Sequence, residues 1–103
     1  MSEIKPTRTA LVTNREGIHA RAATMIAELV RRFDSEVVLI KNHERVSGDQ
    51  PLQILLLTAA HGDRVTLEAQ GPDAEQALDS LLELFAENFG DDQEPTEQAE
   101  NQS

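Results

Sequence analysis

The chain has 103 residues, the size of one small domain, and a net charge of −10. It contains no cysteine, which excludes disulfides, zinc–thiolate sites and a cysteine nucleophile and is typical of the reducing cytoplasm. The negative charge argues against nucleic-acid binding, which needs basic residues to neutralise phosphates. The longest apolar run is too short to cross a bilayer, and the first residues lack the apolar core of a secretory signal. We therefore expect a soluble, cytoplasmic protein.

The first half of the chain predicts two strands on either side of one helix. Residues 1–7 are polar and we expect them to be flexible, whereas the run 8–13 is β-prone. Residues 14–17 carry the signal of a loop. Apolar residues at helical spacing then predict a helix over 20–33. The β-branched residues of the next run predict a strand over 36–41.

The second half of the chain predicts two more strands and two more helices. Residues 42–47 read as a hairpin turn and a return strand, and a proline opens a short helix from 51 to about 59. Residues 64–69 alternate apolar and polar, as in a half-buried strand. The strongest amphipathic stripe predicts a helix from 74 to about 89, with Asp73 as its N-cap. The order β-α-β-β-α-β-α predicts an α+β fold in which helices cover one face of a mainly antiparallel, four-stranded sheet.

The two ends of the chain differ from the segment between them. Residues 91–103 hold five acidic residues, no basic residue and a single alanine as their apolar content. Such a composition cannot offset the entropy lost on folding, so we expect a disordered acidic tail. The sequence therefore predicts a domain over residues 8–90 between the flexible N-terminus and this tail.

A histidine stands where the first loop meets the first helix. A neutral imidazole nitrogen of His19 can attack a phosphoryl group and form a phosphohistidine. Arg21 adds a permanent cation suited to phosphate, and Gly17 allows a sharp turn. Anions are also attracted by the dipole and the backbone N–H groups of the first helical turn, here those of Ala20, Arg21, Ala22 and Ala23. A histidine at a helix start is more often an incidental capping or surface residue, so this interpretation depends on its context.

That context is more specific than the histidine alone. Residues 17–23, GIHARAA, follow a predicted strand and open a helix. They resemble the active-site signature of HPr, the histidine-containing phosphocarrier family of the bacterial phosphotransferase system. The resemblance extends over about residues 8–89 and implies an open-faced β-sandwich with three helices on one face. The ending, residues 84–92, and Asn14 are similar to the nitrogen-related branch of that family.

The resemblance implies a role for each residue of the loop. His19 would accept a phosphoryl group on Nδ1 from enzyme I and pass it to an enzyme IIA domain, with no bound cofactor. Arg21 matches the arginine that stabilises the phosphate, and Asn14 and Gly17 are possible supporting residues. The protein would be a carrier with a transient phosphohistidine rather than an independent turnover enzyme. A monomer is expected for a shuttle that meets two partners.

The sequence departs from the family pattern at two positions. The family usually has proline after the arginine, where this chain has Ala22, which keeps the backbone N–H that proline lacks. Many members carry a regulatory serine at the cap of the second helix, where this chain has Gln50. Regulation by phosphorylation at that position is therefore expected to be absent, and the role does not transfer to Ser47.

The family also presents an apolar patch from its first two helices to its partners. Leu52 and Leu55 could instead belong to the core, but the second helix holds more leucines than one buried stripe needs, which favours a partner surface. The residues that match the patch are Ala20, Thr24, Met25, Pro51, Leu52 and Leu55.

A second function stays open, and a third is disfavoured. On the same scaffold, a regulatory binding module would use its phosphorylation state to control partner proteins rather than sugar uptake. An independent small-molecule enzyme is disfavoured because no second catalytic group or cofactor motif is visible. His43 and His61 lie in predicted turns without metal-ligand spacing to His19, so no metal site is expected.

Overall fold

This computed structural model describes residues 5–91; residues 1–4 of the predicted flexible N-terminus and residues 92–103 of the predicted tail lie outside the described residues. The described elements follow the predicted order β-α-β-β-α-β-α, with a short 3₁₀ segment at the end. They are β1 (Thr7–Leu11), α1 (Ala20–Val30), β2 (Glu36–Lys41), β3 (Glu44–Ser47), α2 (Pro51–Leu56), β4 (Arg64–Gln70), α3 (Ala74–Ala86) and η1 (Asn88–Gly90).

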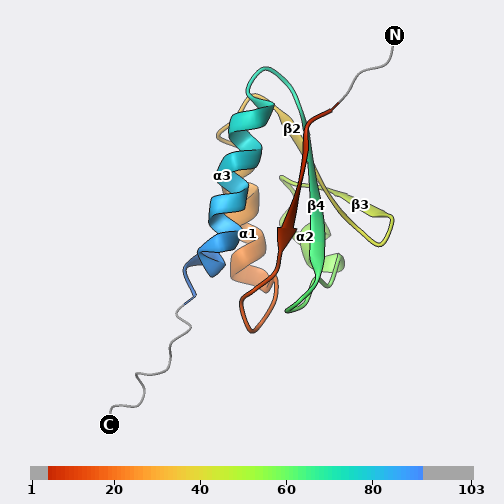
Figure 1. The fold of residues 1–103 in the computed structure, drawn as a ribbon, viewed down its shortest axis with the longest axis vertical. Coiled ribbons are helices and arrows are strands. Elements are labelled where there is room, and N and C mark those ends of the chain that lie inside the picture. Colours follow the sequence, from red (N-terminus) through yellow and green to blue (C-terminus); the bar gives the residue numbers. More distant parts are fainter. Residues whose placement is uncertain (1–4, 92–103) are drawn as a thin grey trace.

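The four strands form one antiparallel sheet in the order β1-β4-β2-β3. In β4, Leu67 lies opposite Arg8 of β1 on one side and Leu39 of β2 on the other. Helices α1 and α3 lie side by side on one side of the sheet, and α2 packs on α1 and β3 (Figure 1). The predicted α+β open-faced β-sandwich is confirmed.

The core lies between the sheet and the helices. The alternation predicted for the strands is confirmed, because Leu39 and Leu67 are fully buried while the Thr9–Thr66 pair lies on the opposite face. Burying one leucine side chain contributes about 1.5–3 kcal/mol. The two long helices add the buried residues Ala22, Ala23, Ile26, Ala27, Val30, Ala74, Ala77, Leu78, Leu81 and Phe85. The alanines let α1 approach its neighbours closely, which fixes the position of its first turn.

All three helices end earlier than predicted, and α3 ends at Ala86 rather than near residue 89. Helix α1 ends at Val30 rather than at residue 33, and Arg31, beyond its end, donates from Nη2 to the carbonyl oxygen of Asp49 at 2.8 Å. Helix α2 ends at Leu56 rather than near residue 59. Thr58 has a φ of 48°, a left-handed conformation that does not continue a helix. The Lys41 ammonium then donates to the carbonyl oxygens of Leu57 and Thr58 at this end of the helix.

The N-cap position predicted for Asp73 at the last helix is confirmed, but its side chain does not cap the helix. Its Oδ1 accepts from the Ser35 hydroxyl at 2.6 Å, and its Oδ2 accepts from the Asp34 backbone N–H at 2.9 Å. The carboxylate therefore ties the start of α3 to the start of β2 instead of satisfying its own helix.

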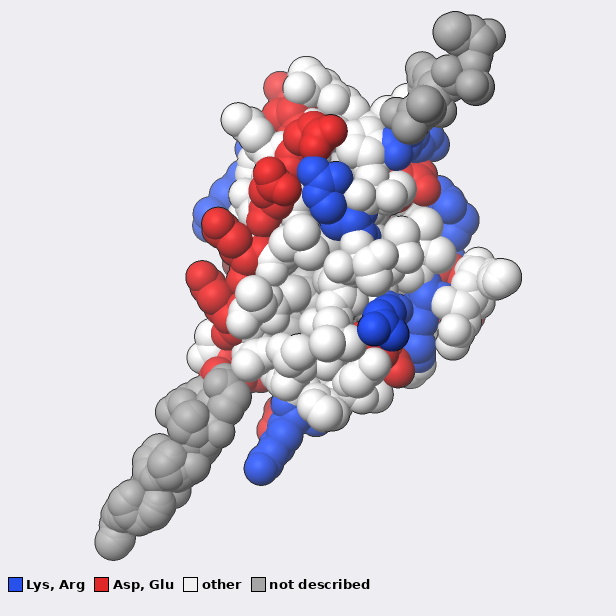
Figure 2. Space-filling view, in the orientation of Figure 1, with Lys and Arg blue, Asp and Glu red and all other residues white. Residues whose placement is uncertain are grey.

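The charged residues of α3 gather on its solvent side. Figure 2 shows acidic side chains along this helix, of which Glu75, Asp79 and Glu83 are exposed. Arg8 of β1 donates to Glu75 at 2.6 Å and lies 3.6 Å from Asp79, so it offsets part of this charge. Among residues 5–91, no helix is long and apolar enough to span a membrane.

Candidate functional site

The loop between β1 and α1 is fixed by a glycine that no other residue could replace without strain. Gly17 has a φ of 70°, and a Cβ there would lie 2.5 Å from the carbonyl oxygen of Ala59. The next residue, Ile18, is buried and donates its N–H to the same carbonyl oxygen at 3.0 Å. These contacts fix the loop against the segment after α2 and place the next residue, His19, at the start of α1.

His19 is the N-cap residue of α1, in extended conformation with φ −85° and ψ −178°. Its Nδ1 accepts the backbone N–H of Ala22 at 3.1 Å. A backbone amide can only donate, so this hydrogen bond assigns the unprotonated nitrogen to Nδ1. The extra amide expected from Ala22 in place of proline is therefore used, and it is used to hold the histidine ring.

The other ring nitrogen of His19 faces a carboxylate. Nε2 lies 3.0 Å from Oδ2 of Asp91 and donates its proton to that oxygen, because Nδ1 is the acceptor. Both side chains are half-buried, with exposures of 21% and 19%. The ring is held at both nitrogens, which leaves one tautomer compatible with both contacts.

Arg21 reaches the same carboxylate. Its Nη2 forms an ion pair with Oδ1 of Asp91, and its Nη1 donates to the carbonyl oxygen of Phe89 at 3.3 Å. The guanidinium is 59% exposed, so it can be reached from solvent. The two predicted site residues, His19 and Arg21, are thus brought together through a residue that sequence reasoning assigned to the tail.

Asn14 is a buried residue that binds both the loop and the carboxylate of Asp91. Its side chain is 1% exposed, and its Nδ2 donates to the Gly17 carbonyl oxygen at 2.7 Å and to Asp91 Oδ2 at 3.1 Å. Its Oδ1 is buried and has no hydrogen-bond partner within the described part of the chain. The supporting position predicted for Asn14 therefore has a definite geometry.

The environment of Asp91 favours its charged form. Burial by itself would raise the pKa of this carboxyl, but hydrogen bonds from His19 and Asn14 and the nearby charge of Arg21 outweigh it and lower the pKa. Asp91 is therefore a carboxylate that neutralises Arg21 and accepts from His19.

The turn after α3 places Asp91 against α1. Asn88 and Phe89 both have a φ of 57°, which curls the chain back after the helix. Phe89 is fully buried and packs edge-to-face on Phe85, with ring centroids 4.9 Å apart. The assignment of Asp91 to a disordered tail is corrected: a buried aromatic two residues earlier anchors it. Phe89, a large apolar residue at the expected end of the helix and next to Gly90, was the sequence signal that could have indicated this.

The four backbone amides predicted to bind phosphate are not equivalent. The N–H of Ala23 bonds to the carbonyl oxygen of His19 at 2.9 Å as the first helical hydrogen bond, so it is not a free donor. The N–H of Ala22 points to the His19 ring. Ala20 and Arg21 occupy the first two helical positions, where an α-helix leaves N–H groups without intrahelical acceptors.

The residues predicted as a partner surface lie on the adjoining helices α1 and α2. Ala20, Thr24 and Leu52 are exposed, and Leu52 retains 76% of its accessible surface. The remaining three members, Met25, Pro51 and Leu55, are half-buried. Leu56, which the prediction omitted, is 73% exposed. The surplus of leucines in α2 was the signal for it.

The remaining predicted features lie apart from this site. Gln50 is the exposed N-cap residue of α2 and makes no side-chain capping bond. His43 and His61 are exposed. Within residues 5–91, no group of three or more histidine, cysteine, aspartate or glutamate residues could hold a metal ion.

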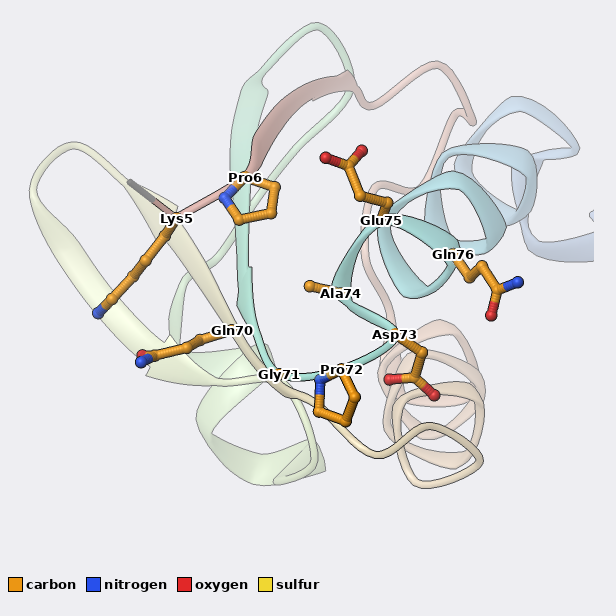
Figure 3. A pocket seen from close by; sticks show the side chains of 9 residues that line it. All are labelled: Lys5, Pro6, Gln70, Gly71, Pro72, Asp73, Ala74, Glu75 and Gln76. Carbon is orange, nitrogen blue, oxygen red and sulfur yellow. The ribbon is translucent and has the colours of Figure 1, made fainter. Parts of the chain in front are cut away.

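An open hollow lies between the end of β4 and the start of α3 (Figure 3). None of its lining residues belongs to the predicted site. They are Lys5, Pro6, Gln70, Gly71, Pro72, Asp73, Ala74, Glu75 and Gln76.

Comparison with known proteins relates the chain to one family. Residues 6–87 match the family model of the PTS HPr component phosphorylation site. The chain is 37% identical over 84 residues to the phosphocarrier protein HPr of Cupriavidus necator, covering 82% of this chain and 94% of the relative. It is also 37% identical over 87 residues to the phosphocarrier protein NPr of Escherichia coli K12, covering 82% and 96%. The crystal structure of HPr-C-His from Thermoanaerobacter tengcongensis superimposes with a TM-score of 0.80 at 29% identity, covering 84% and 98%.

Proposed function

The chain belongs to the HPr family of phosphocarrier proteins, and from this premise we propose that His19 accepts a phosphoryl group on Nδ1 and passes it to a second protein. One observation carries the proposal: Nδ1 is unprotonated, and its lone pair, held at the N-terminus of α1, accepts a hydrogen bond from the amide of Ala22. An amide that donates to this nitrogen also lies where it can donate to a phosphate oxygen bound there.

The groups around His19 suit phosphoryl transfer, which depends on positioning and on neutralising charge at the equatorial oxygens. The amides of Ala20 and Arg21 lie in the first helical turn, whose positive dipole end attracts anions. The Arg21 side chain is long and exposed, so it can turn from Asp91 to a phosphate on the ring. Together these groups would hold the phosphoryl group between donor and acceptor.

The proposed partners are enzyme I as donor and an enzyme IIA domain as acceptor. Both would dock on the apolar surface that α1 and α2 present beside His19, defined here by Ala20, Thr24, Leu52 and Leu56 and called the docking surface below. Exposed leucines are otherwise costly in water, so two of them on α2, the helix that packs on α1, support a partner contact.

Labelling with phosphoenolpyruvate and a cognate enzyme I tests this function. The wild-type protein is expected to take up one phosphoryl group, and His19→Ala is expected to take up none. His43→Ala serves as the matched control, because His43 is an exposed histidine in the β2–β3 turn. Undiminished labelling of His19→Ala would contradict the assignment.

A second candidate is a regulatory module whose partners respond to the phosphorylation state of His19. It is favoured by one comparison: the NPr relative from Escherichia coli is as similar to this chain as the HPr relative from Cupriavidus necator. A pull-down with phosphorylated and unphosphorylated protein distinguishes the two functions. Identical partner sets in both states would argue against such a switch.

A further inference from the structure

The imidazole of His19 is bound from two opposite edges by groups that demand the same tautomer. On one edge the Ala22 amide donates to Nδ1 at 3.1 Å, so Nδ1 carries no proton. On the other edge the Asp91 carboxylate lies 3.0 Å from Nε2, so Nε2 carries the proton. Asp91 is itself held by Asn14 and by the chain anchored at Phe89, so its position does not depend on the histidine alone.

We propose that Asp91 is a positioning residue for phosphoryl transfer at His19. It fixes the Nε2–H tautomer, leaves the Nδ1 lone pair as the nucleophile and supplies a counter-charge to the ring when the phosphoryl group is bound. This inference rests on the proposed function of His19. It adds a residue outside the residues 6–87 that match the family model.

The transfer balances without a proton leaving His19. The hydrogen bond from the Ala22 amide to Nδ1 breaks first, which frees the Nδ1 lone pair. This lone pair then forms the new N–P bond while the bond from phosphorus to the donor breaks, and the electron pair of the broken bond stays with the donor. Because Nε2 keeps its proton, the ring gains positive charge as the bond forms. The Asp91 carboxylate lies against that proton and neutralises the developing charge, as an aspartate does behind the histidine of a serine hydrolase. When the phosphoryl group passes to the acceptor, the N–P bond breaks, its electron pair returns to Nδ1 and the ring becomes neutral again.

The position of Asp91 does not obstruct Nδ1. The carboxylate contacts the Nε2 edge, and the phosphoryl group bonds at the Nδ1 edge by the Ala22 amide. Arg21, from the first turn of α1, is a charged group that faces Asp91, and the neutral side chains of His19 and Asn14 contact the carboxylate from the α1 N-cap and the loop. When phosphate recruits Arg21, the contacts of Asp91 to Asn14 and His19 remain to hold it.

The first test uses ¹⁵N NMR of the imidazole in the full-length, unphosphorylated protein at neutral pH. We expect the Nε2–H tautomer in the wild type, with an Nε2 proton that exchanges slowly with water. Asp91→Ala should speed this exchange, whereas Asp91→Asn keeps an acceptor oxygen and should largely preserve the tautomer. Asp79→Asn is the control, since it removes one exposed acid from α3.

The second test measures the rate of phosphoryl uptake from phosphorylated enzyme I by the same proteins. Asp91→Ala should be slower by roughly tenfold or more, the scale of a lost charge-assisted hydrogen bond. Asp91→Asn should fall between Asp91→Ala and the wild type, because it keeps the tautomer but lacks the counter-charge. Asp79→Asn should transfer at the wild-type rate.

The outcomes separate this inference from the function on which it rests. A wild-type protein that takes up no phosphoryl group would overturn the proposed function and the inference with it. A wild-type protein that is labelled while Asp91→Ala shows unchanged Nε2–H exchange and an unchanged rate would overturn the inference alone. Faster uptake by Asp91→Ala would also overturn it, because Asp91 would then act as a competitor for Arg21.

Discussion

At the scale of single residues, the site depends on positions where the backbone leaves no alternative. Gly17 lies against the segment after α2 with a left-handed φ, and His19 follows it at the helix N-cap. A side chain at Gly17 would push this loop away from Ala59 and move the histidine with it. The conformation of one glycine therefore sets the position of the nucleophile.

Gly17→Ala is expected to lower the free energy of unfolding by about 2–3 kcal/mol, because it combines a positive φ with a steric clash. The matched control is Gly62→Ala, where φ is 93° but a Cβ would meet nothing within 4 Å. The control should cost about 1 kcal/mol, from the φ alone. Urea unfolding of both variants measures the difference, and equal losses would contradict the role of the clash.

At the scale of elements, the ends of the helices carry the chemistry and the long-range ties. In the first turn of α1, the Ala22 amide binds the side chain of the N-cap histidine. At the start of α3, the N-cap carboxylate of Asp73 instead binds residues just before β2. Both cases use a helix start as an attachment point. The role of each N-cap side chain therefore depends on which hydrogen-bonding groups the tertiary packing places next to it.

Ala22→Pro removes the amide that holds Nδ1. Because a side-chain cap contributes about 1 kcal/mol, we expect a loss of stability of that size and a more mobile ring. Ala20→Pro is the control, since proline is tolerated at the first helical position and the extended His19 precedes it. Imidazole NMR measures the mobility of the ring, and urea unfolding measures the stability. A ring that stays equally ordered in Ala22→Pro would show that the Ala22 amide does not hold the His19 ring.

Asp73 gives the fold a dependence on pH. Hydrogen bonds from the Ser35 hydroxyl and the Asp34 N–H lower the pKa of its carboxyl in the folded protein. Its contribution to stability is therefore complete above the unfolded pKa of about 3.9 and is lost as the pH falls through the lower folded pKa. Asp73→Ala should flatten the decline of unfolding free energy in this acidic range, and Glu83→Gln on α3 should not. A slope unchanged by Asp73→Ala would contradict this.

At the scale of the whole molecule, the sheet and helices form a support with the site at one end. The chain leaves α3 beside the start of α1 (Figure 1). The docking surface of α1 and α2 adjoins that start, because the two helices pack on each other. The acidic row of α3 (Glu75, Asp79 and Glu83) and the hollow at the β4–α3 turn are separate from it.

Leu52→Asp should leave the stability within about 0.5 kcal/mol of wild type, because the side chain is exposed. Its uptake of phosphate from enzyme I should weaken by roughly tenfold through a raised KM, the effect of losing a central interface residue. Leu11→Asp is the control, since Leu11 is an exposed leucine on β1 outside the docking surface. Equal KM values for Leu52→Asp and the control would remove Leu52 from the docking surface.

Much of the fold could be predicted because its signals are local. The alternation in β4 and the stripe of α3 identified buried residues correctly, since strand and helix periodicities act over a few neighbours. The ends of α1 and α2 were less accurate, because a left-handed Thr58 and the bonds of Lys41 to carbonyl oxygens are set by packing. The side chain of Asp73 was assigned to the wrong partner for the same reason.

The sequence by itself determined the strand–loop–helix setting of His19, its neighbour Arg21 and the glycine that shapes the turn. These features lie within a few residues of one another, so local conformation fixes them. Only the tertiary structure placed the carboxylate of Asp91, 72 residues along the chain, against His19 Nε2. That contact exists because Phe89 is buried in the core and Asn88 and Phe89 turn the chain back onto α1. Such a contact depends on the packing of two helices and has no periodicity by which a sequence could show it.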